Sequence, residues 1–75
     1  MTTLRQALRI ARGEALAARA MGQIYTRDIE LDNGRTIEIR HMAATERGSY
    51  LFGAWYWAYA PTRADDRPRQ HRLLR

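Results

Sequence analysis

The stretch IYTRDIELDNGRTIEIRHM, residues 24–42, alternates apolar and polar side chains on both sides of Asn33-Gly34. Alternation about an Asn-Gly turn is typical of a β-hairpin. A two-residue loop would place Ile29 opposite an acidic residue and leave neither face apolar. A three-residue loop, with Gly34 in the left-handed conformation, pairs Ile29 with Ile37 and collects the apolar side chains on one face. The sequence therefore predicts a hairpin with a three-residue loop.

A second short segment with a glycine, residues 45–49, leads into the aromatic stretch 50–60. Aromatic enrichment favours a strand. If this turn has the same loop geometry, Ile39 lies opposite Trp55, and both tryptophans join the apolar face of the hairpin. The alternative for this stretch is a second helix.

Residues 1–23, before the hairpin, are rich in alanine and repeat apolar side chains at spacings of three and four. This period predicts a helix that Thr2 or Thr3 can cap and Gly22 can end, with Gly13 weakening it by about 1 kcal/mol. Four arginines fall within a sector of about 80° on this helix. They form either a solvated face or a surface for phosphates and acidic groups: Arg5, Arg9, Arg12 and Arg19.

Together these elements predict an α+β fold, with one N-terminal helix packed on a three-stranded antiparallel β-meander. The alternative architecture is helix, β-hairpin, helix. The folded unit is expected to span residues 1–60 as a single small domain. Residues 61–75 hold five arginines and both prolines and are expected to form a flexible basic tail. Leu73 and Leu74 are unusual in a solvated tail and suggest that its end docks.

The composition limits the classes of function. A chain of 75 residues without cysteine has no disulfide framework and is too short for a two-lobed enzyme. No stretch is long and apolar enough to span a membrane, and the protein is expected to be cytoplasmic. The net charge is +5, and all thirteen cationic side chains are arginine, through codon bias or through function. The excess charge lies in residues 1–23 and 61–75, whereas residues 24–60 carry all the aromatic side chains.

The sequence contains no recognisable catalytic constellation. Only His41 and His71 could serve as a histidine base, and no nucleophile motif accompanies them. His41 falls on the inward face of the predicted sheet and is interpreted as a hydrogen-bonded core histidine. Glu14 is expected to pair with an arginine of the sheet. We therefore predict a protein without enzymatic activity, cofactor or metal site.

The sheet face that points away from the helix combines aromatic, methionine and arginine side chains, a composition typical of protein-binding hot spots. The tail folding back over this face and a homodimer formed through it are the alternatives. The predicted partner-binding residues are Arg40, Met42, Phe52 and Tyr56 on the sheet, with Arg5, Arg9, Arg12 and Arg19 on the helix.

The leading hypothesis is a non-enzymatic protein-interaction module. Its size and composition suit a phage or mobile-element inhibitor that blocks a host nucleic-acid-handling complex, such as a CRISPR effector, by occupying a binding surface. The alternative is a small DNA- or RNA-binding protein that uses the helix and the tail. For that alternative the binding residues are Arg5, Arg9, Arg12, Arg19, Arg67, Arg69, Arg72 and Arg75.

Overall fold

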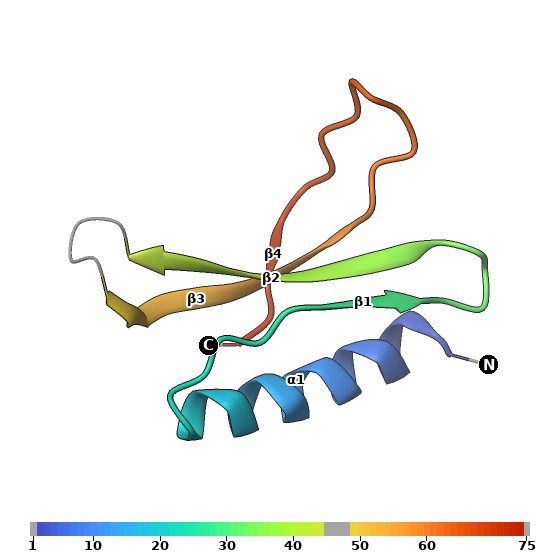
Figure 1. Cartoon of the computed structure of the whole chain (residues 1–75). Helices are drawn as coiled ribbons and strands as arrows, with labels where there is room; N and C mark the ends of the chain where they lie inside the picture. Colours follow the sequence, from blue (N-terminus) through green and yellow to red (C-terminus); the bar gives the residue numbers. More distant parts are fainter. Residues whose placement is uncertain (1, 45–48, 75) are drawn as a thin grey trace.

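The computed structural model describes residues 2–44 and 49–74, although the side chains of residues 42–44 and 49–53 fall outside this description. A single helix lies along one face of an antiparallel sheet (Figure 1). The strand order is β1-β2-β3-β4, so each strand pairs with its neighbour in sequence. The predicted α+β class is confirmed, and the stretch after residue 49 is a strand rather than a second helix. The elements are α1 (Leu4–Ala20), β1 (Arg27–Glu30), β2 (Thr36–Ala44), β3 (Ser49–Tyr59) and β4 (His71–Arg72).

The ends of α1 follow from local sequence. Thr3 is the N-cap, and its side chain accepts a hydrogen bond from the Gln6 N–H, while the Gln6 side chain accepts one from the Thr3 N–H. This reciprocal capping box satisfies two backbone donors at the start of the helix. At the other end Gly22 has a φ of +69°, and the Gln23 N–H donates to the Ala18 carbonyl over 2.8 Å. This is the Schellman arrangement, in which a left-handed residue closes the helix.

The two helix-associated glycines should respond oppositely to substitution. Gly13 lies within α1, and a Cβ added there meets no atom within 4 Å. We expect Gly13→Ala to raise the free energy of unfolding by about 1 kcal/mol, because alanine has the higher helix propensity. Gly22→Ala should lower it by about 1 kcal/mol, because alanine is strained at positive φ. Urea denaturation followed by circular dichroism measures both, and a destabilising Gly13→Ala would contradict the interior position of this residue.

The β1–β2 hairpin has the predicted register. Ile29 pairs with Ile37, and the Leu31 N–H donates to the Arg35 carbonyl over 2.7 Å, which leaves a loop of three residues. Gly34 has a φ of +83°, and the Asn33 side chain accepts a hydrogen bond from the Arg35 N–H. The strand itself is shorter than the alternating stretch, because β1 begins only at Arg27.

The β2–β3 register differs from the prediction by two residues. Ile39 pairs with Trp57, and His41 pairs with Trp55, whereas the sequence placed Ile39 opposite Trp55. The cause is an irregularity near the turn: one residue of β2 and four residues of β3 lie between the pairs Met42↔Ala54 and Ala44↔Ser49. A shift of two preserves the alternation of side chains, so the tryptophans still point to the predicted face.

The core lies between α1 and the sheet. Three alanines of the helix, Ala7, Ala11 and Ala15, are fully buried, and their short side chains leave room for larger side chains of the sheet. The sheet supplies the larger side chains. Its most buried members are Ile37 and Ile39, with Ile29, Leu31 and Trp55 around them.

The end of the chain joins this core. Leu73 and Leu74 are 3% and 9% exposed and belong to the same cluster as the helix alanines. The Leu73 N–H donates to the Trp55 carbonyl, and the Leu73 carbonyl accepts a hydrogen bond from Arg12 Nε. β4, which precedes these leucines, adds a short fourth strand that the sequence did not predict. The expected docking of the two leucines is confirmed.

Candidate functional site

The sheet face away from α1, called the outer face below, is built from the residues that alternate with the core positions. Arg40 of β2 lies directly opposite Tyr56 of β3, and Tyr56 lies opposite Arg72 of β4. A row of two arginines with a tyrosine between them therefore crosses the sheet. The predicted register of the aromatic strand places Ala54 opposite Arg40 instead, and the two-residue shift between β2 and β3 corrects this.

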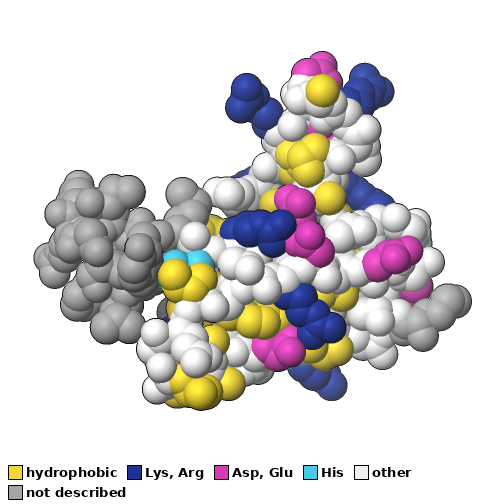
Figure 2. All heavy atoms as spheres, in the orientation of Figure 1, with side chains coloured by type: hydrophobic (Ala, Val, Ile, Leu, Met, Phe, Trp, Pro, Cys, Tyr) yellow, Lys and Arg dark blue, Asp and Glu magenta, His cyan; other side chains and the backbone are white. Residues whose placement is uncertain are grey.

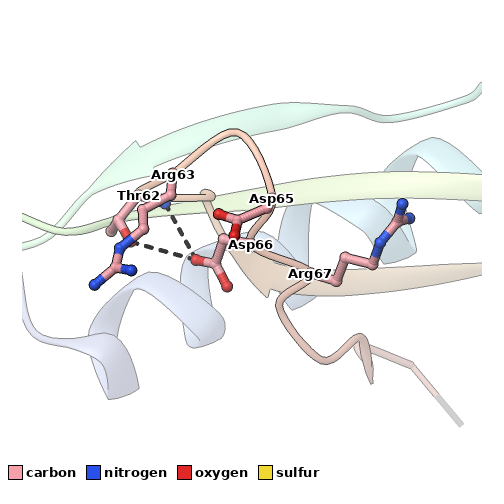
Figure 3. A pocket seen from close by; sticks show the side chains of 5 residues that line it. All are labelled: Thr62, Arg63, Asp65, Asp66 and Arg67. Carbon is pink, nitrogen blue, oxygen red and sulfur yellow. Dashed lines mark hydrogen bonds between the residues drawn. The ribbon is translucent and has the colours of Figure 1, made fainter.

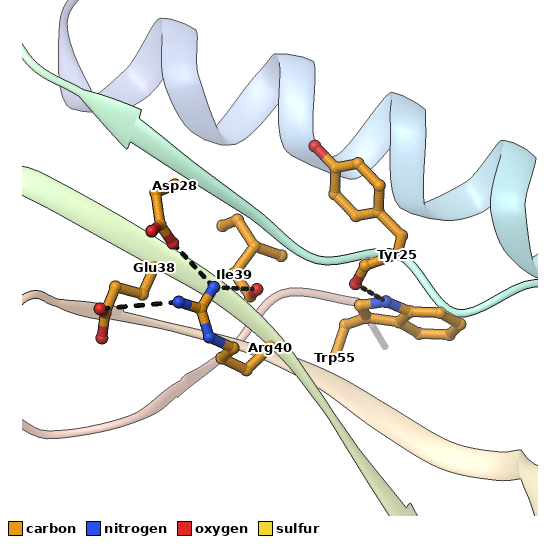
Figure 4. Close-up of polar contacts among 6 residues, drawn as sticks. All are labelled: Tyr25, Asp28, Glu38, Ile39, Arg40 and Trp55. Atoms are coloured by element: carbon orange, nitrogen blue, oxygen red, sulfur yellow. Dashed lines mark hydrogen bonds and ion pairs between the residues drawn. The ribbon is translucent and has the colours of Figure 1, made fainter.

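Arg40 is held in place by acidic neighbours (Figure 4). One of its terminal nitrogens lies 2.7 Å from an Asp28 carboxylate oxygen, and the other lies 3.6 Å from Glu38. The guanidinium also donates to the Ile39 carbonyl. The hydrogen bond with Asp28 raises the pKa of Arg40 above its already high ordinary value. The Arg40 guanidinium is therefore held in one position, and the neighbouring carboxylates balance its charge. It can orient a bound partner through hydrogen bonds, but it adds little net positive charge to the surface.

The outer face keeps its side chains accessible, whereas the helix-facing side is buried. Ala54, Tyr56 and Ala58 along β3 are half-buried, and Asp28, Arg40 and Arg72 are exposed. An apolar centre is thus surrounded by charged groups. Acidic and basic atoms touch one another on the view of the molecule in Figure 2, in agreement with the ion pairs at Arg27 and Arg40.

The predicted partner-binding residues fall into separate groups. Arg40 and Tyr56 come together on the outer face, and the side chains of Met42 and Phe52 lie outside the described residues. Arg5, Arg9, Arg12 and Arg19 are exposed on α1, which packs on the opposite side of the sheet. Arg40 and Tyr56 therefore do not form one surface with the helix arginines.

One side of α1 is linked to β1 by a polar cluster. Glu14 Oε1 accepts hydrogen bonds from Tyr25 Oη over 2.6 Å and from Arg27 over 2.5 Å. The predicted pairing of Glu14 with a sheet arginine is confirmed. The hydrogen bond from Tyr25, and then that from Arg27, lower the pKa of Glu14. Partial burial and the bond to Glu14 raise the pKa of Tyr25 to about 12.

This cluster predicts an unusual tyrosine titration. The neutral phenol is favoured in the folded state, so its contribution to stability is present below the ordinary pKa of 10.0 and is lost as pH rises through about 12. The tyrosinate absorbance near 295 nm should contain a component with a midpoint of about 12 that Tyr25→Phe removes. Glu14→Gln should lower that midpoint without bringing it to 10, because desolvation remains. An unchanged titration curve for Tyr25→Phe would contradict the assignment.

The core side of the sheet also carries a row of ring and guanidinium contacts that the sequence did not predict, with Trp57 and Tyr59 packed against the core cluster. The Arg35 guanidinium lies 3.7 Å from the Tyr59 ring centroid, Tyr59 meets Trp57 edge to face at 5.7 Å, and Trp57 stacks on His71 at 4.5 Å. Tyr59 and Trp57 are half-buried, and Arg35 and His71 are exposed. The period-two spacing of the tryptophans indicated that both point to the core side of the sheet. The stacking of Trp57 could not be predicted, because its partner His71 was assigned to the flexible tail.

The predicted nucleic-acid-binding arginines are also divided. Arg72 pairs with Tyr56 across the sheet, its Nε donates to the Leu74 carbonyl, and it lines a depression of about 450 Å³ together with Arg12 and Leu16 of α1. Arg75 lies outside the described residues. Arg67 and Arg69 belong to the loop between β3 and β4. That loop projects away from the helix, and its first turn is closed by Asp66, which accepts hydrogen bonds from the Thr62 N–H and hydroxyl (Figures 1 and 3). Among the described tail arginines, Arg72 therefore lies beside the helix, whereas Arg67 and Arg69 belong to a loop that projects away from it.

His41 has the predicted inward position, opposite Trp55. Its ring lies tilted by 55° against Trp55 with the ring centroids 4.5 Å apart, and its Nε2 has no hydrogen-bond partner among the described atoms. The expectation of a hydrogen-bonded core histidine is therefore not met at Nε2. Among the described residues, no group of three or more His, Asp or Glu side chains is arranged to hold a metal ion.

No protein-family model, curated protein or solved structure matches the chain. Within the described part of the chain, no helix combines the length and apolarity needed to cross a membrane. The surfaces of the molecule therefore provide the only indication of its function.

Proposed function

We propose that this protein is a non-enzymatic protein-interaction module that binds its partner through the outer face of the sheet. One observation carries the proposal: the helix and the last leucines fill one side of the sheet, while the described side chains of the other side remain accessible. A single layer of helix cannot cover both faces of a sheet. The face left open has a surface on which a partner can pack.

The composition of this face supports a protein as the occupant. Ala54, Tyr56 and Ala58 form a flat apolar strip along β3, and charged groups surround it. An apolar centre with a polar rim is the usual anatomy of a protein interface, and tyrosine and arginine are enriched among interface residues. The Arg40 network is already ordered, so binding would immobilise few side chains.

A shallow, open hollow at the rim could receive a polar group of the partner. It measures about 480 Å³ and is lined by Thr26, Arg27, Asp28 and Arg40. The hollow contains both signs of charge, which favours a polar side chain able to donate and accept hydrogen bonds. Occupying a partner's surface in this way would be sufficient for inhibition, the mode that the sequence suggests for a host nucleic-acid-handling complex.

Site-directed photocrosslinking tests this proposal. Benzoylphenylalanine at position 56 should crosslink to a discrete partner in the cells that produce the protein. Benzoylphenylalanine at position 63, in the exposed β3–β4 loop, should not capture that species. A crosslink between two copies of the chain would show instead that the outer face forms a homodimer, and it would contradict a heterologous partner at this face.

Paired variants test the face itself. Arg40→Glu combined with Tyr56→Ala should abolish capture of the partner by a tagged protein, with circular dichroism unchanged. The control is Arg63→Glu combined with Thr62→Ala, which makes the same change of charge on the loop and should retain the partner. If the outer-face variant still captures the same partner, the outer face is not the binding site.

A further inference from the structure

The charge on the helix-facing side of the molecule is strongly segregated. Most of the described carboxylates lie elsewhere: Glu14 is on the β1 side of the helix, Asp28, Glu30 and Glu38 alternate with the core positions of the hairpin, and Asp65 and Asp66 are in the β3–β4 loop. Asp32 alone among them lies near the start of the helix, where its N–H donates to the Thr2 carbonyl. Among the described side chains, Arg5, Arg9 and Arg12 form no ion pair with any of them. A side of the molecule with three exposed arginines that no described carboxylate neutralises through an ion pair favours an anionic ligand.

These arginines lie beside the stacked row Arg35–Tyr59–Trp57–His71. At 100° per residue Arg5, Arg9 and Arg12 fall within about 60° of one another. Arg12 Nε donates to Leu73, two residues after His71, which fixes this sector on the β3–β4 side of the helix. At the other end the Thr2 carbonyl accepts a hydrogen bond from the Asp32 N–H, close in sequence to Arg35. The arginines and the stacked row therefore run along the same side, over the same length.

We propose that this side binds single-stranded nucleic acid, with the phosphates along Arg5, Arg9 and Arg12 and the bases against the stacked row. Proteins that bind single strands without sequence preference combine a basic track for the backbone with aromatic rings for the bases. Here the Trp57–His71 stack ends at an exposed ring, so a base can extend it. The rings are already ordered by their mutual contacts, which reduces the entropy lost on binding.

The same features disfavour a duplex as the ligand. In a duplex the bases are stacked on one another, and their faces are not available to His71 or Trp57. A duplex could use only the arginines, and three contacts give weak binding. The side proposed to bind nucleic acid differs from the outer face proposed to bind a protein. A negative result for one of these surfaces therefore leaves the proposal for the other unaffected.

Fluorescence anisotropy with labelled oligo(dT) and oligo(U) of about 15 nucleotides tests the proposal. Both should bind at about 50 mM salt, and the affinity should fall about tenfold to twentyfold by about 200 mM, as expected for three phosphate contacts on a single strand. A duplex of the same length should bind at least about tenfold more weakly at the lower salt. The absence of binding at about 50 mM salt, or equal binding of the duplex, would overturn the proposal.

Two matched pairs of variants locate the site. Arg5→Glu with Arg9→Glu should weaken oligonucleotide binding about tenfold or more, whereas Arg63→Glu with Arg67→Glu, which has the same net charge, should weaken it less than about threefold. His71→Ala should weaken binding about fivefold or more, and His71→Phe, which keeps a ring, should not. Equal losses within either pair would overturn the proposal, because they would indicate a general charge effect or a structural role for His71.

Discussion

Trp55→Ala is expected to leave the protein largely unfolded. Trp55 is 5% exposed and packs in the cluster that joins the helix alanines to the sheet. Its indole N–H donates to the Tyr25 carbonyl over 2.9 Å (Figure 4), so truncation would open a cavity and leave that carbonyl without its partner. Removing a buried tryptophan costs about 3–5 kcal/mol. The whole free energy of unfolding of a domain this small is about 4–11 kcal/mol, and urea denaturation should show most of it lost.

Two variants show which part of Trp55 matters. Trp55→Phe keeps an aromatic ring and removes the N–H, so the free energy of unfolding should fall by about 1–3 kcal/mol. Trp57→Ala removes a half-buried indole at the edge of the core and should cost less than Trp55→Ala. If Trp57→Ala proved the more damaging of the two alanine variants, the centre of the core would lie nearer the stacked row than the packing indicates.

The parts of the fold that the sequence predicted well are those set by local chemistry. Asn33-Gly34 determines the first hairpin because a left-handed glycine fits a three-residue loop, and Ile29 and Ile37 then share the buried face. Thr3 and Gly22 likewise delimit the helix through hydrogen bonds made within a few residues. In each case the sequence signal and the interaction that it produces lie close together in the chain.

The parts that it missed depend on contacts between distant segments. The two-residue shift between β2 and β3 arises from a bulge that no side-chain pattern marks, and the alternation of faces is the same in either register. β4 contains only His71 and Arg72 and becomes a strand because the Leu73 N–H bonds to β3 and the leucines find the core. The segment after β3 is polar in composition, and this hid the fact that its last few residues join the sheet and the core.

The candidate sites show the same division. The sequence placed Tyr56 and Arg40 on one face because strand alternation is a local rule, but their direct opposition depends on the bulge. The helix arginines were recognised as a stripe from their period. Their neighbours could not be deduced, because Arg12 meets Leu73 and Trp57 meets His71 only through tertiary contacts. A surface that combines the helix with β3 and β4 can therefore be recognised only from the folded structure.

Leu73→Ala is expected to destabilise the whole domain rather than only its last residues. Leu73 is 3% exposed, packs with the buried side of α1, and anchors the chain end through its N–H bond to Trp55 and its carbonyl bond from Arg12. Truncating a buried leucine costs about 2–5 kcal/mol, so the urea midpoint should fall in proportion. The amide of Leu73 should also exchange with solvent faster in the variant, because its bond to β3 would open more readily.

Ile10→Ala is the matched control, because Ile10 is 46% exposed on α1 and removing its side chain takes little apolar area from the core. It should change the free energy of unfolding by no more than about 0.5 kcal/mol. If Leu73→Ala behaved like Ile10→Ala, the tail end would not be part of the cooperative unit. The Trp57–His71 stack would then lack its support, because Leu73 is what holds β4 against β3. The stability of Leu73→Ala therefore tests whether the core extends to the last residues of the chain.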